Sequence, residues 1–265
     1  MGKYSRVLLQ GVNQGLQFRQ GFFLGVFSGA IPALIAVYFW PAVFSSATTH
    51  VGRYEPRQMT TYFLLAFALS GLAQYETDWQ LWYSIRNGGI SSVILKPMNP
   101  WAYYVAQQIG RAVPLTLGFF ALIGLVSLVF ADKVISGPNL IQLSLFVLSL
   151  VIAAHLGAIM SVLRGLLAFW LHDFGPLGWL DRILISFLAG AYLPLEFFPH
   201  PLRVVASLLP FNLVLYSPIQ VFLGQGGYRN SLHMIMLQVV WLLVLLPVTG
   251  FIWRIGSRRY EASGG

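Results

Sequence analysis

The chain has 265 residues, of which 57% are hydrophobic and only 9% are charged. Soluble domains carry about 25% charged residues, so this composition excludes a water-soluble protein and indicates an integral membrane protein. The formal net charge of +8 is carried by basic residues beside hydrophobic blocks, which indicates membrane orientation rather than nucleic-acid binding. The sequence contains no cysteine, which excludes disulfides and thiol nucleophiles.

Residues 1–20 predict an amphipathic helix that lies in the membrane interface. Tyr4, Leu8, Val12 and Leu16 are four residues apart, the spacing of one helix face, and polar residues occupy the other faces. No uninterrupted apolar core or small-residue cleavage site precedes Arg19, so we expect this segment to be retained rather than removed as a signal peptide.

Six apolar stretches predict six transmembrane helices and an all-α fold in a single transmembrane domain, residues 1–265. A helix of about 20 apolar residues spans a hydrocarbon core about 30 Å thick, and the alternation typical of a membrane β-barrel is missing. The predicted spans are residues 21–44, 58–75, a third within 101–130, then 140–163, 183–195 and 232–253.

Residues 192–227 are ambiguous, because five prolines exclude one straight helix while the apolar run 204–223 resembles a seventh span. The distribution of charge favours six spans. With six, both basic termini and most of the 16 lysines and arginines fall on one side of the membrane. The positive-inside rule then places both termini in the cytoplasm and makes 192–227 a set of short re-entrant or interfacial helices on the outer side.

The sequence contains none of the motifs expected for catalysis by this chain. There is no G-x-x-x-x-G-K-[ST] loop to hold nucleotide phosphates, and the five histidines are scattered without metal-ligand spacing. His155 lies well inside a predicted span. It is either a residue of a transport pathway or a neutral imidazole bonded to a neighbouring helix.

The stretch RNGGISSVILKPMNP, residues 86–100, lies in the predicted cytoplasmic connection 78–100 between the second and third spans. Two adjacent glycines and two prolines predict a break, a brief helix across the membrane plane and a turn. Its apolar residues exceed what solvent exposure favours, which indicates contact with another surface: Ile85, Ile90, Val93, Ile94 and Leu95.

Three stretches carry a family resemblance: EPRQMTTYFLLAFAL at 55–69, SIRNGGISSVILKPMNPWAYYVAQQIG at 84–110, and AGAYLPLEFFPHPLRVVASLLPFNLVLYSPIQVFLG at 189–224. With them the chain resembles the membrane subunits of ATP-binding cassette exporters, the six-span permeases of the drug and polysaccharide export type (ABC-2-like). The likeness extends over nearly the whole chain.

This resemblance implies roles for two segments. Residues 85–96 look like the coupling helix that docks on a separate nucleotide-binding subunit, and residues 194–211 look like an outer hairpin that caps the translocation path. Arg86 then has two open interpretations, contact with the ATPase subunit or with lipid headgroups, and Glu196 has no assigned role. The implied coupling residues are Ile85, Arg86, Gly88, Gly89, Ile90, Val93, Ile94 and Lys96. The implied outer-gate residues are Pro194, Glu196, Phe197, Phe198, Pro199, Pro210 and Phe211.

The resemblance also implies partners. We expect two ATPase subunits, which bind the ATP and Mg²⁺, and a second permease, identical or related, in the inner (cytoplasmic) membrane of a bacterium. This chain is expected to bind no cofactor. A self-sufficient carrier or channel is the main alternative, and a lipid-modifying membrane enzyme using His172, Asp173 and Asp181 is a weaker one. The absence of carboxylates inside the predicted spans favours hydrophobic, amphipathic or lipid-linked substrates.

Overall fold

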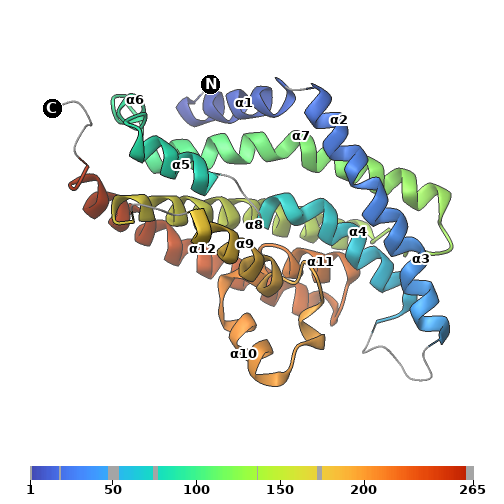
Figure 1. Cartoon of the computed structure of the whole chain (residues 1–265). Coiled ribbons are helices and arrows are strands. Elements are labelled where there is room, and N and C mark those ends of the chain that lie inside the picture. The colour runs from blue at the N-terminus through green and yellow to red at the C-terminus, as the bar shows by residue number, and fades with distance from the viewer. Residues whose placement is uncertain are drawn as a thin grey trace.

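The computed structural model describes residues 2–17, 19–46, 54–73, 77–135, 137–171 and 175–260, and all regular structure within them is helical. Three long helices run side by side, and other helices pack against them (Figure 1): α7 (Pro100–Val129), α8 (Leu140–Leu166) and α12 (Gly227–Ser257). Four helical stretches of the described chain are long and apolar enough to cross a membrane: Gly21–Ser45, Pro100–Val129, Leu140–Phe169 and Gly227–Ser257.

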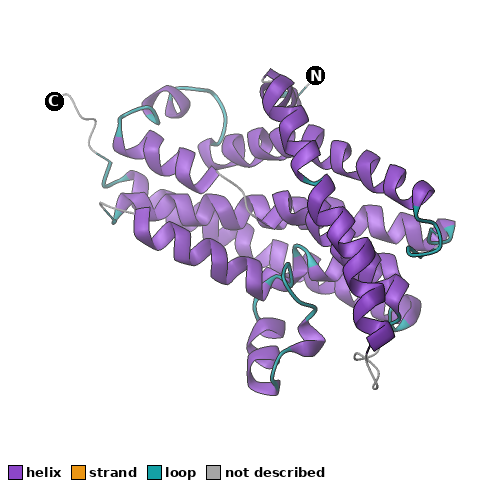
Figure 2. Ribbon diagram, turned by 45° about the vertical axis from the view of Figure 1, so that its right-hand side comes forward, coloured by secondary structure: helices purple, strands orange, loops and turns teal. Residues whose placement is uncertain are grey.

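The remaining elements are shorter, and short connections or turns separate them (Figure 2). In chain order they are α1 (Lys3–Gln17), α2 (Arg19–Ser28), α3 (Ala30–Ser46), α4 (Pro56–Ala73), α5 (Thr77–Arg86), α6 (Ser91–Ile94), the 3₁₀ turn η1 (Leu167–Phe169), α9 (Gly175–Leu188), η2 (Leu195–Phe197), α10 (His200–Leu208), η3 (Pro210–Leu213) and α11 (Tyr216–Leu223).

The predicted helices at 101–130, 140–163 and 232–253 are confirmed as α7, α8 and α12. The predicted span 21–44 consists of α2 and α3, which are separated at Gly29. The predicted span 183–195 is wrong in its bounds, because α9 begins at Gly175 and ends at Leu188. The chain turns directly after it, at Gly190, whose φ of 84° is a conformation that favours glycine.

A single helix over 204–223 does not form. α10 ends at Leu208, and Leu209 is extended, with φ −91° and ψ 152°. This is the conformation expected of a residue that precedes a proline, here Pro210. The alternative of a seventh continuous span is therefore wrong.

The N-terminal segment forms the predicted helix, but α1 lies along the first half of α7 (Figure 1). Gly11 packs against the backbone of Gln107, and Gly110 packs against the backbone of Leu8, so the two helices approach each other closely. Tyr4 and Leu16, on the predicted apolar face, stay more than 40% exposed. The position of α1 flat in the membrane interface therefore stays a prediction. The packing of α1 along α7 does not support it.

Both ends of the described chain contact the segment between α5 and α7. The Lys3 ammonium donates to the Pro97 carbonyl at 2.8 Å, and the Tyr260 and Ser91 hydroxyls share a hydrogen bond of 3.0 Å. The two ends therefore lie at the same end of the helix bundle, as an even number of crossings requires.

Residues 190–215 form a hairpin that leaves the bundle between α9 and α11 (Figure 1). Its neck is closed by the Tyr216 amide, which donates to the Ala189 carbonyl at 3.1 Å, and by the Tyr62 hydroxyl, which donates to the Gly190 carbonyl at 2.7 Å. Three buried residues of the hairpin form a small core together with Leu188 of α9: Leu195, Phe198 and Ala206.

Candidate functional site

The first candidate site is the predicted coupling segment, where α5 is followed by a tight turn and the single helical turn α6. Gly88 has φ 77°, a conformation that favours glycine, and the Ile90 amide reaches back to the Ser84 carbonyl at 3.0 Å. The sequence correctly predicted a break at the glycines followed by a brief helix.

The apolar residues of this segment divide between two faces. Ile85, Ile90 and Val93 are buried in the core of the chain, with exposed fractions of 6%, 0% and 6%. Ile94 is 42% exposed and Leu95 is 85% exposed. Of the implied apolar docking residues, only Ile94 is therefore accessible, and Leu95 adjoins it.

The two basic residues of the segment contact this chain itself. The Arg86 Nη2 donates to the Leu171 carbonyl at 2.8 Å, beyond the end of η1, and the Lys96 ammonium lies 4.1 Å from the ring centroid of Tyr103. These contacts tie the segment to α7 and to the chain that follows α8.

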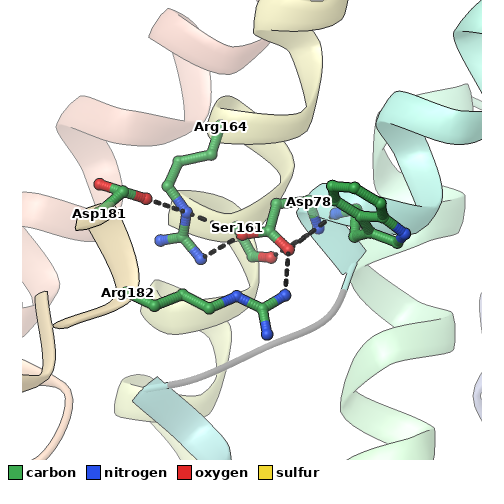
Figure 3. Close-up of polar contacts among 6 residues, drawn as sticks. Asp78, Ser161, Arg164, Asp181 and Arg182 are labelled. Atoms are coloured by element: carbon green, nitrogen blue, oxygen red, sulfur yellow. Dashed lines mark hydrogen bonds and ion pairs between the residues drawn. The ribbon is translucent and has the colours of Figure 1, made fainter. Parts of the chain in front are cut away.

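A buried ion-pair network lies behind this segment and was not predicted (Figure 3). The side chain of Asp78, in α5, is only 2% exposed, and Arg164 of α8 binds its Oδ2 through Nη2 at 3.0 Å and Nε at 3.1 Å. Arg182 of α9 lies 3.5 Å from the other oxygen. Arg164 also lies 3.1 Å from a carboxylate oxygen of Asp181.

The network therefore balances two carboxylates against two guanidinium groups and joins three helices. The Asp78 amide also donates to the Ser161 hydroxyl at 3.0 Å, and Gly165 lets α5 approach α8 closely. A usable signal was present in the sequence: two acids and two bases in segments predicted to meet at the same membrane face. The other residues of the enzyme alternative, His172 and Asp173, lie outside the described residues.

The second candidate site is centred on Glu196 in the hairpin. Its carboxylate accepts hydrogen bonds from the Tyr54 hydroxyl at 3.0 Å and from the Tyr216 hydroxyl at 2.6 Å. Gln220 supports Tyr54 with a 2.6 Å hydrogen bond from its side-chain amide.

The other implied gate residues make packing contacts or turns of the hairpin. Phe197 stacks on Tyr54 with centroids 6.2 Å apart, and the buried Phe198 stacks on Phe187 of α9 at 4.6 Å. Three prolines set the turns: Pro194 precedes η2, Pro199 precedes α10, and Pro210 begins η3. Phe211 is partly buried against the hairpin core.

His155 does not point into the packed interior. It lies on the exposed side of α8, where its Nδ1 is 2.8 Å from the Val151 carbonyl one turn earlier. It borders an apolar groove of about 210 Å³ between α7 and α8. Within the described residues, no three His, Asp or Glu side chains gather as metal ligands.

A larger groove of about 700 Å³ lies between α3, α4 and the beginning of the hairpin. Five of its eleven lining residues are aromatic, and none of the lining residues is charged. Among them Trp40 and Phe63 stack with ring centroids 4.8 Å apart. The groove therefore suits an apolar or aromatic molecule rather than an ion.

Comparison with known proteins gives one family match. The sequence model of a family described as ABC-2 family transporter protein matches residues 30–264. A search of curated proteins finds no match to the chain.

Proposed function

Because the chain belongs to the ABC-2 family of transporter proteins, we propose that it is the permease subunit of an ATP-driven exporter and forms half of its translocation pathway. A separate nucleotide-binding subunit binds ATP and Mg²⁺ and hydrolyses the nucleotide. Two such subunits and a second permease, identical or related, complete the transporter in the inner membrane.

The observation that carries this proposal is the accessible apolar tip of α6, formed by Ile94 and Leu95. An exposed leucine beside an exposed isoleucine at one end of a membrane bundle suits docking into a groove of a partner protein. The opposite side of the same turn is anchored by the buried Ile90 and Val93, so force on the tip is transmitted to the chain behind it.

The path of transmission runs through α5. The tip follows α5 directly, and α5 is tied by Asp78 to α8 and α9. ATP binding by the partner favours one arrangement of the ATPase subunits, and a rigid connection of this kind lets that preference shift the equilibrium between two arrangements of the helices.

Six crossings follow from these helices if α4 and the pair α9 and α11 are added to the four long apolar stretches. α9 has 14 residues and α11 has eight, which at 1.5 Å per residue give about 33 Å together, close to the hydrocarbon thickness of about 30 Å. They meet at the neck of the hairpin. The fifth crossing is thus a broken one, with the hairpin inserted on the outer side.

The aromatic groove between α3 and α4 is the best candidate for this chain's part of the pathway. It is open on one side, as half of a pathway completed by a second permease must be, and its uncharged lining suits hydrophobic or amphipathic substrates.

The test is Leu95→Asp in the tagged full chain, captured from native membranes in mild detergent and assayed for ATPase activity. We expect at least about tenfold less ATPase recovered, because an apolar contact at the centre of a docking surface contributes about 2 kcal/mol or more. Ser92→Asp is the matched control: it adds the same charge to an exposed polar position of the same turn and should retain the ATPase.

Unchanged recovery and unchanged activity with Leu95→Asp would overturn docking through this tip. If the wild-type chain were captured without any ATPase, the exporter assignment itself would fail and a self-sufficient carrier would replace it. Asp at Ile90 or Val93 is unsuitable for this test, because both side chains are buried and the fold would be lost together with docking.

A further inference from the structure

A pocket of about 230 Å³ lies between the hairpin and α12, apart from both the docking tip and the aromatic groove. Since one water takes about 30 Å³ in the liquid, the pocket has room for a small polar group of several atoms. Its polar lining is Glu196, Arg203, Ser207, Asn212, Tyr216, Ser217 and His233.

One of the residues that line this pocket, Asn212, carries a buried acceptor that the described chain does not satisfy. Asn212 is only 6% exposed, and its amide nitrogen donates to the Ala206 carbonyl at 2.9 Å, which fixes the orientation of the side chain. Its Oδ1 has no hydrogen-bond partner among the described residues. A buried acceptor without a donor is costly, so a donor from a ligand would be favoured here.

Glu196 adds negative charge to the same pocket. Its two hydrogen-bond donors, Tyr54 and Tyr216, are neutral hydroxyls, and no cation of the described chain pairs with its carboxylate. A half-buried carboxylate and an unpartnered amide oxygen among the residues of one pocket lining favour a group that combines positive charge with N–H donors.

The rim of the pocket carries the opposite charge. Arg203 is exposed, and its Nη2 is held by the backbone carbonyls of Glu196 and of Phe198, the latter at 3.1 Å. Its other guanidinium nitrogens make no hydrogen bond within the described chain and suit a phosphate. Negative charge inside and positive charge at the rim match a ligand that carries an ammonium and a phosphate.

The depth of the pocket indicates where such a ligand would come from. α12 has 31 residues, about 46 Å, so about 8 Å extends beyond a 30 Å hydrocarbon core at each end if the helix is centred. His233 and Leu237 follow Gly227 by six and ten residues, or about 9 and 15 Å along the helix. The pocket thus lies near the boundary between headgroups and hydrocarbon.

We propose that this pocket binds the headgroup of an ethanolamine phospholipid of the outer leaflet. The ammonium lies between Glu196 and the Asn212 Oδ1, and the phosphate lies at Arg203. Free phosphoethanolamine has the same chemistry, and the experiment below separates the two sources.

The test is native mass spectrometry of the purified full chain, titrated with phosphatidylethanolamine, phosphatidylcholine or phosphatidylglycerol of identical acyl chains. The ethanolamine lipid should be retained about tenfold better than the choline lipid, whose quaternary ammonium has no N–H to donate to Asn212. Equal retention of the ethanolamine lipid and the choline lipid would overturn the proposal. This comparison uses the wild-type chain alone.

Glu196→Gln should abolish this preference, because it removes the charge while keeping an acceptor for one tyrosine. Glu55→Gln is the control, since it removes an exposed carboxylate from the chain just before α4. Equal preference in wild type and Glu196→Gln would also contradict the proposal. If millimolar phosphoethanolamine raises the melting temperature of the wild type but not of Glu196→Gln, while the ethanolamine lipid is retained no better than the choline lipid, the soluble molecule is the ligand and the lipid is not.

Discussion

Arg164 is the residue on which the ion-pair network depends, because its guanidinium contacts both Asp78 and Asp181. Arg182 contacts only Asp78, at 3.5 Å, and its side chain is 30% exposed. Removing a buried partner leaves an uncompensated charge, whereas a partly exposed ion pair contributes little.

We therefore expect Arg164→Gln to lower the free energy of unfolding by about 3 kcal/mol or more, and Arg182→Gln by no more than about 1 kcal/mol. At about 2–4 °C per kcal/mol, the melting temperatures of the purified chain in detergent should separate by roughly 5 °C or more. Arg57→Gln, at an exposed position of α4, is the control for loss of a cation. Equal melting temperatures of Arg164→Gln and Arg182→Gln would contradict the larger contribution of Arg164 to stability.

Single-residue roles were only partly predictable from the sequence. Arg164 and Arg182 were recognised as basic residues flanking spans, but the meeting of α5, α8 and α9 around Asp78 depends on the distances between helices, which no local pattern encodes. Glu196 was noted without a role, because its donors Tyr54 and Tyr216 are 142 and 20 residues away in the chain.

At the level of elements, the contact between α1 and α7 depends on glycines. A Cβ on Gly110 would meet the backbone of Leu8, so Gly110→Ala should force the two helices apart and cost about 1–3 kcal/mol. We expect a lower melting temperature and faster release of α1 by trypsin.

Gly124→Ala is the matched control in the same helix. A Cβ there meets nothing within 4 Å, and alanine favours the helix by about 1 kcal/mol, so this variant should melt no lower than wild type. If Gly110→Ala behaved in the same way, the close packing of α1 on α7 would be contradicted.

The sequence predicted α7, α8 and α12 best, because in each of them the apolar stretch of the sequence and the helix have nearly the same bounds. The pattern failed at α9, since the apolar run from 183 to 195 continues through the turn at Gly190. Hydrophobicity reports burial in lipid or protein, and it does not report whether the helix is continuous. The prolines around the hairpin were the better guide there.

At the level of the whole molecule, two independent features agree on how the chain is threaded. The distribution of basic residues predicted that both termini share one side, and the contacts of Lys3 and Tyr260 with the α5–α7 connection place both described ends at one end of the bundle. The opposite end holds the starts of α8 and α12, where the Asn139 side-chain amide donates to the Tyr228 hydroxyl at 2.7 Å.

This threading can be tested directly because the chain contains no cysteine. Single cysteines at Ser92, beside α6, and at Arg229, near the start of α12, both occupy exposed positions at opposite ends of the bundle. With three crossings between them, Arg229→Cys should react with a membrane-impermeant maleimide on intact cells, and Ser92→Cys should react only after permeabilisation.

Glu55→Cys, which is separated from position 92 by α4 alone, should also react on intact cells. If Glu55→Cys reacts but Arg229→Cys does not, the broken crossing of α9 and α11 fails, because α7 and α8 are each long and apolar enough to span the membrane and the α9–α11 pair is the remaining crossing between positions 92 and 229. The outer-leaflet assignment of the headgroup pocket would fail with it, while docking through Leu95 would stand.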